Sequence, residues 1–142
     1  MQDTARLFAY STWGLMISLG IIIFTHPFFQ FINESLFTLI LIPLAFAFLY
    51  FNLAHVAVKR FIRKVVAPTN FHILLALLIF LPPLAWIIIM NKPYGNEDFL
   101  LILVLLIAIV TGTILGNKAG IKARYEYIQM LKEAQKKSKA SS

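Results

Sequence analysis

Four long apolar runs without a charged side chain restrict what this sequence can fold into. They cover residues 7–25, 36–58, 71–90 and 99–115, and none contains Asp, Glu, Lys or Arg. A helix needs about 20 apolar residues to cross a hydrocarbon core of about 30 Å. The runs are continuous rather than alternating, unlike the strands of a membrane barrel. We therefore predict four transmembrane helices at about 7–26, 36–58, 71–90 and 99–119.

Composition supports a membrane protein. Apolar residues make up 60% of the chain and charged residues 13%, whereas soluble domains carry about 45–50% and about 25%. The predicted connectors are short, so consecutive helices must run in opposite directions. The expected fold class is an all-α integral membrane protein. Residues 1–120 form an antiparallel four-transmembrane-helix bundle, and residues 121–142 form a basic, largely helical C-terminal extension.

The distribution of positive charge predicts the orientation. Twelve of the thirteen Lys and Arg residues fall on one predicted side, and only Lys92 falls on the other. Because loops rich in Lys and Arg stay in the cytoplasm, we expect both termini to be cytoplasmic. The expected location is the bacterial inner (plasma) membrane. The net charge of +7 is concentrated beside apolar runs, which favours anionic lipid headgroups over nucleic acid as its partner.

A stripe of small residues marks the fourth span. Ala108, Gly112, Gly116 and Gly120 recur at every fourth position, which gives one helix face a smooth surface. In lipid, such stripes permit close backbone approach between helices. The stripe either packs on another span of this chain or binds a separate subunit.

The segment after Gly120 is rich in strong helix formers. Lys122 and Glu126 are spaced for an i,i+4 ion pair, and Tyr125 and Ile128 share one helix face. We expect the fourth helix to extend into the cytoplasm. Tyr125 and Ile128 are candidate contacts for a protein partner or a second copy of the chain.

Two further features point to lipid contact and to a bend. Four basic residues that follow the second span, and that we expect to contact lipid headgroups, are Lys59, Arg60, Arg63 and Lys64. The adjacent Pro82 and Pro83 deprive two carbonyl groups of the third span of their helical donors. They predict a kink there.

Two histidines are candidate cofactor ligands. His55 lies late in the second span and His72 in the first turn of the third, so the two should lie at similar depth. They could face one another across a haem b or a quinone, with Asn52 beside His55. The alternative is a pair of interfacial histidines that bind water, phosphate or backbone. No other cofactor is expected.

Catalysis is disfavoured. The six carboxylates fall outside the spans, at Asp3, Glu34, Glu97, Asp98, Glu126 and Glu133, and the chain has no cysteine. No nucleophile with a nearby base, no cluster of metal ligands and no glycine-rich phosphate loop can be assembled. We expect no enzyme and no metal site.

Three functions remain. The favoured hypothesis is a non-catalytic accessory, assembly or anchoring subunit of a larger membrane complex. The second is a haem- or quinone-binding membrane anchor that uses His55 and His72. The third is a small transporter or channel for a hydrophobic or lipid substrate, since spans without charge offer little to an ion.

Overall fold

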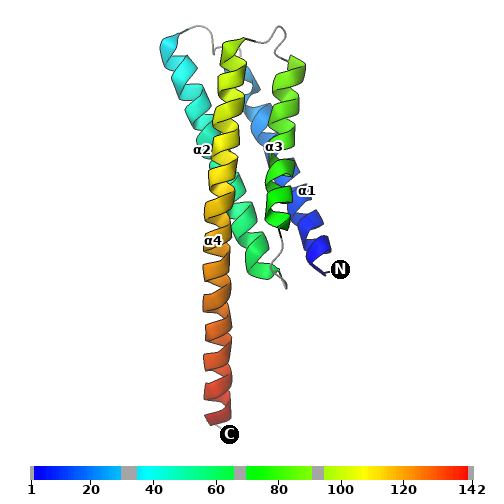
Figure 1. Cartoon of the computed structure of the whole chain (residues 1–142), viewed down its shortest axis with the longest axis vertical. Coiled ribbons are helices and arrows are strands. Elements are labelled where there is room, and N and C mark those ends of the chain that lie inside the picture. Colours follow the sequence, from blue (N-terminus) through cyan, green and yellow to red (C-terminus); the bar gives the residue numbers. More distant parts are fainter. Residues whose placement is uncertain (1, 30–34, 66–69, 91–94, 141–142) are drawn as a thin grey trace.

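The computed structural model describes residues 2–29, 35–65, 70–90 and 95–140. These residues form four helices (Figure 1), which are α1 (Gln2–Phe29), α2 (Leu36–Lys64), α3 (Phe71–Met90) and α4 (Asn96–Ala140). Each is long and apolar enough to cross a membrane, which confirms the four predicted helices. Glu34 and Lys92 lie outside the described residues.

Three of the four helices are longer than the apolar runs. Helix α1 begins at Gln2 and continues through Pro27 to Phe29, and α2 continues through its basic residues to Lys64. Helix α4 is 45 residues long and ends only at Ala140. Hydrophobicity marks the part of a helix that lies in lipid, whereas the helix itself ends where its backbone hydrogen bonding ends.

Helices α2 and α4 pack along the small-residue stripe. A Cβ atom added at Gly112 would lie 2.5 Å from the carbonyl oxygen of Phe51, and one added at Gly116 would lie 2.7 Å from that of His55. At Gly120 the added atom would lie 2.8 Å from the Cβ of Ile62. No side chain fits at these separations, so glycine is what allows the two backbones to approach.

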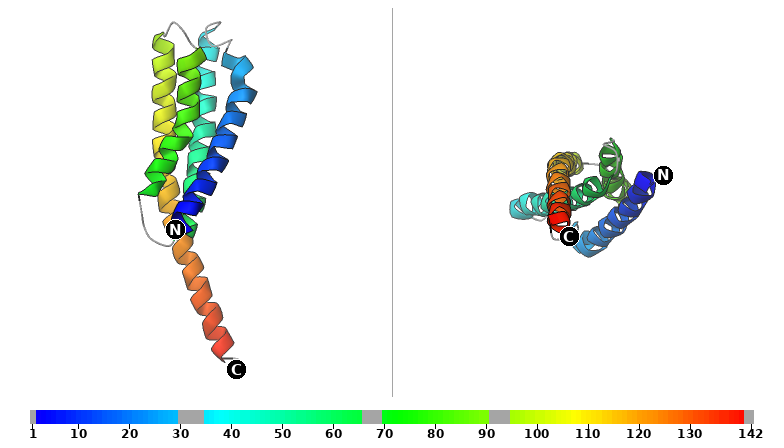
Figure 2. Two further views of the ribbon diagram at one scale, coloured as in Figure 1. Left: turned by 90° about the vertical axis from the view of Figure 1, so that its right-hand side faces the viewer. Right: turned by 90° about the horizontal axis from the view of Figure 1, so that it is seen from below.

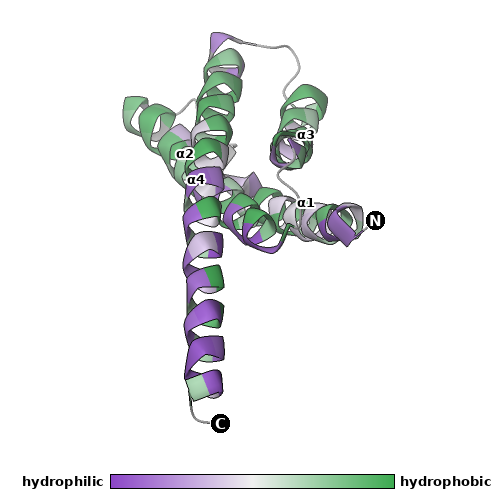
Figure 3. Ribbon diagram, turned by 60° about the horizontal axis from the view of Figure 1, so that its bottom comes forward, coloured by the Kyte–Doolittle hydropathy of each residue, from purple (hydrophilic) through white to green (hydrophobic). Residues whose placement is uncertain are grey.

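The bundle buries its large side chains between helices and exposes many others. Tyr50, Phe61, Ile79 and Leu105 are fully buried. The outer faces of all four helices carry exposed large apolar side chains, among them Phe8, Phe24, Phe48, Ile89 and Leu103. Figure 3 shows apolar colour over the bundle and hydrophilic colour along the projecting part of α4. Apolar exposure of this extent is expected for helices that face lipid.

Helix α1 is joined to the bundle by buried hydrogen bonds between Ser18 and Tyr50 and by close packing. The hydroxyl groups of Ser18 and Tyr50 lie 2.8 Å apart, linking α1 to α2. A Cβ added at Gly14 would lie 3.1 Å from the Cγ1 atom of Ile79 in α3. In a bilayer a buried hydroxyl needs such a partner, because no water is available.

Both prolines of α3 lie inside one continuous helix from Phe71 to Met90. Pro83 is buried and Pro82 half-buried. The left view of Figure 2 shows α3 changing direction partway along its length, as expected where two carbonyl groups lack amide donors.

The contact of Gly112, Gly116 and Gly120 with α2, which we call the glycine seam, leads to a first prediction. Gly116→Ala should destabilise the protein by about 1–3 kcal/mol, because its methyl group overlaps the His55 carbonyl. The matched control is Gly20→Ala in α1, where an added Cβ has no atom within 4 Å, and alanine should be neutral or stabilising by up to about 1 kcal/mol. Unfolding with SDS in mixed micelles measures both. Equal effects would contradict the seam.

A double-mutant cycle tests the buried hydrogen bond. Ser18→Ala, Tyr50→Phe and the double variant should give a coupling energy of about 0.6 kcal/mol, and at most about 1.7 kcal/mol, the range for hydrogen bonds between membrane helices. The same unfolding assay gives the coupling. Additive losses would show that the two hydroxyls do not interact.

Candidate functional site

Three helix ends meet at one end of the bundle, which we call the basic end. It comprises the start of α1, the end of α2 and the start of α3, beside α4 (Figure 1). The Arg6 guanidinium donates a hydrogen bond to the carbonyl oxygen of Lys64. The rings of Tyr10 and Phe61 meet edge to face, with centroids 6.2 Å apart. The start of α1 therefore lies directly against the last turns of α2.

The four basic residues predicted to contact lipid headgroups lie on the exposed side of these turns. Lys59, Arg60, Arg63 and Lys64 are exposed, whereas the intervening apolar residues are buried. The guanidinium of Arg60 lies over the ring of Trp13, 5.9 Å from its centroid. Two of the helices thus share a cation–π contact at the level where headgroups are expected.

The arm, defined as residues 121–140 of α4, continues beyond the basic end for about 30 Å. Figure 2 shows it projecting past the other helices. The arm is exposed except at Ala123 and Arg124, which are half-buried. The Arg63 guanidinium lies over the ring of Tyr127, 5.9 Å from its centroid, and so connects α2 to the arm.

The predicted packing and partner residues separate into two groups. Ala108, Gly112, Gly116 and Gly120 lie on the α4 face that packs against α2. Tyr125 and Ile128 lie on the arm, with exposed fractions of 64% and 39%. The stripe thus has a helix of the same chain against it, and the arm residues are the ones open to another molecule.

His55 and His72 have different surroundings in the part of the chain that the structure describes. The His55 ring stacks on Phe51, with centroids 6.1 Å apart, and Phe51 lines a groove between α2 and α4. His72 lines two cavities beside α3 and α4. The α4 residues of the Phe51 groove and those of the inner His72 cavity lie on opposite sides of that helix. Haem or quinone binding by this pair stays a hypothesis.

The nearby polar side chains bond to their own helices. The side-chain amide of Asn52 donates a hydrogen bond to the carbonyl oxygen of Phe48 at 2.8 Å. This bond lies within α2 and does not involve His55. The hydroxyls of Thr111 and Thr113 donate to the carbonyls four residues earlier, at 2.8 and 2.7 Å. Within the described residues, no group of three or more His, Cys, Asp or Glu side chains is placed to hold a metal ion.

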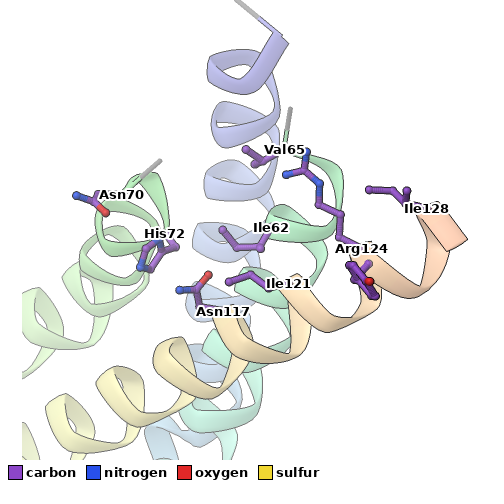
Figure 4. A pocket seen from close by; sticks show the side chains of 9 residues that line it. Ile62, Val65, Asn70, His72, Asn117, Ile121, Arg124 and Ile128 are labelled. Carbon is purple, nitrogen blue, oxygen red and sulfur yellow. The ribbon is translucent and has the colours of Figure 1, made fainter. Parts of the chain in front are cut away.

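A cavity at the base of the arm was missed by sequence reasoning. It has a volume of about 570 Å³ and is lined by His72, Asn117 and Arg124, among others (Figure 4). The cation–π contacts of Arg60 and Arg63 were also missed. Their only sequence signal is the presence of Trp and Tyr near clusters of Lys and Arg, which does not identify the pairs.

No protein-family model, curated protein or solved structure matches this chain.

The contact between Arg63 and Tyr127 leads to a third prediction. Tyr127→Ala should lower hydrogen-exchange protection in the first turns of the arm by about two- to fivefold, because a partly exposed cation–π contact contributes about 0.5–1 kcal/mol. Met130→Ala, at an exposed position of the same arm, is the control and should have a smaller effect. Equal losses in the two variants would mean that the contact does not hold the arm.

Proposed function

We propose that this chain is a non-catalytic subunit of a larger membrane complex, which it anchors or assembles through the arm. In this proposal the bundle holds the protein in the bilayer, and the arm presents a rigid helix to a protein partner at the membrane surface. The observation that carries the proposal is the arm itself, a helix of about 30 Å that extends beyond the bundle with large apolar side chains exposed.

The chemistry of the arm favours a protein partner. Tyr125, Tyr127, Ile128, Met130 and Leu131 are all exposed, which is unfavourable for a helix surrounded by water. Tyr127, Ile128 and Leu131 form a stripe on one side of the arm. The other side carries charge of both signs, with Lys122 near Glu126 and Glu133 near Lys137 at i,i+4 spacing. A helix with an apolar stripe and charged positions beside it is a usual ligand of a hydrophobic groove or of a partner helix.

The positive charge supports an orientation with the basic end in the cytoplasm. The arm carries six Lys and Arg residues against two Glu residues, and the basic turns of α2 lie at the same end. Because such charge is retained on the cytoplasmic side of bacterial inner membranes, we place the partner in or beside the cytoplasm.

The interior of the bundle favours this role over transport of ions. The four apolar runs carry no acidic or basic residue apart from histidine, whereas ion pathways in membranes use carboxylates or paired charges. Two of the polar groups that lie there, the hydroxyls of Ser18 and Tyr50, are engaged in a hydrogen bond between α1 and α2.

A photo-crosslinking amino acid at residue 128, on the apolar face of the arm, tests the proposal. In the native membrane it should give one predominant product, with a protein of different sequence identified by mass spectrometry. The same amino acid at residue 126, on the charged face, is the control and should give much less of it. A product made of two copies of this chain, or equal labelling from both positions, would contradict the proposal.

A further inference from the structure

The cavity at the base of the arm combines polar and apolar walls. Its polar side chains are Asn70 and His72 at the start of α3, and Asn117 and Arg124 in α4. The remaining lining residues are Ile62 and Val65 at the end of α2, and Ile121, Tyr125 and Ile128 in α4. Figure 4 shows His72 and Asn117 directed into the space between α3 and α4, with Arg124 extending from α4 toward the end of α2.

The cavity lies at the level where the lipid interface is expected. Near it, α2 ends at Lys64, α3 begins at Phe71, and the apolar run of α4 ends at Leu115. All three helices therefore change from apolar to polar sequence at about the same height. A molecule bound here would have one part at the headgroup layer and another in the hydrocarbon.

A second, apolar cavity adjoins the first at His72. It has a volume of about 240 Å³, lies between α3 and α4, and extends from His72 to Phe80 and from Ile114 to Leu106. Nine residues of helix correspond to about 12 Å. His72 lines both cavities, so the polar pocket and the apolar groove adjoin one another.

The charge of the polar cavity selects an anionic ligand. Its lining contains a guanidinium, an imidazole and two amides, and no carboxylate. Arg124 is half-buried there, while the arm residues that follow it are exposed. A partly buried guanidinium in a cavity that two amide side chains also line is suited to a phosphate group, because guanidinium and phosphate form paired, charge-assisted hydrogen bonds.

We propose that the two cavities form a binding site for one anionic glycerophospholipid. Arg124 and Asn117 bind its phosphate and headgroup, and one acyl chain occupies the groove between α3 and α4. This site is separate from the general contacts of Lys59, Arg60, Arg63 and Lys64 with the bilayer surface. It does not depend on a protein partner for the arm.

Native mass spectrometry of the intact protein in mixed micelles tests the phosphate part of the site. Titration with phosphatidylglycerol should show one retained lipid, bound more tightly than phosphatidylcholine with the same acyl chains. Arg124→Gln should weaken its binding about tenfold, the effect of losing one charge-assisted hydrogen bond. Lys132→Gln removes the same charge two turns further along the arm and should have little effect.

A second pair of variants tests the groove. Val110→Phe should fill the groove and weaken phosphatidylglycerol binding about fivefold or more. Val104→Phe, on the opposite side of α4, makes the same substitution in a different groove and should not. Circular dichroism and gel filtration confirm that the variants remain folded.

Three results would overturn the proposal. Equal losses in Arg124→Gln and Lys132→Gln would mean diffuse electrostatic attraction rather than a site. Equal binding of both lipids to the unmodified protein would exclude selection by charge. Displacement of the lipid by millimolar inorganic phosphate, with Val110→Phe unaffected, would identify a site for free phosphate instead of a phospholipid.

Discussion

The close approach of the α2 and α4 backbones is the constraint on which the rest of the structure depends. Lipid supplies no hydrophobic force that would press helices together, so contact area must come from surfaces that fit. Gly112, Gly116 and Gly120 provide such a surface, and the carbonyl groups of Phe51 and His55 occupy the space where side chains would lie. The other two helices pack around this pair, with the hydrogen bond between Ser18 and Tyr50 holding α1 in place.

The seam also determines where function can reside. It leaves α4 supported along α2 down to Gly120, and the helix then continues without interruption as the arm to Ala140. The contact of Arg63 with Tyr127 extends that support past the seam. Because the stripe is occupied by α2, the surfaces open to other molecules are the arm and the cavities beside α3. The phospholipid cavity is lined in part by Tyr125 and Ile128 of the arm, so the two proposed surfaces meet at the base of the arm.

The sequence predicted the part of the fold that the bilayer determines, which is the number and position of the apolar helices. The apolar runs follow from the thickness of the bilayer, and α3 ends at the predicted Phe71 and Met90. Helix ends outside the lipid were placed less well, because the first two spans were predicted to end near residues 26 and 58, whereas α1 continues to Phe29 and α2 to Lys64. Pairings across the bundle were beyond reach for a different reason. A small-residue stripe indicates that another helix packs closely against it. Only the three-dimensional arrangement shows that this helix is α2. The depth of His55 and His72 could be inferred from their positions in the sequence, but the direction in which each ring points depends on the rotation of each helix.

Both proposed roles require α4 to be one continuous helix from the membrane to the end of the arm. The chain has no cysteine, so spin labels attach only where cysteines are introduced. Labels at residues 100 and 132, both exposed, are 32 residues apart on nearly the same face of the helix, which corresponds to about 48 Å. Double electron–electron resonance on the protein in lipid nanodiscs should give a narrow distance distribution centred near that value. A broad distribution at shorter distances would show that the helix breaks below the seam, and would contradict the rigid arm.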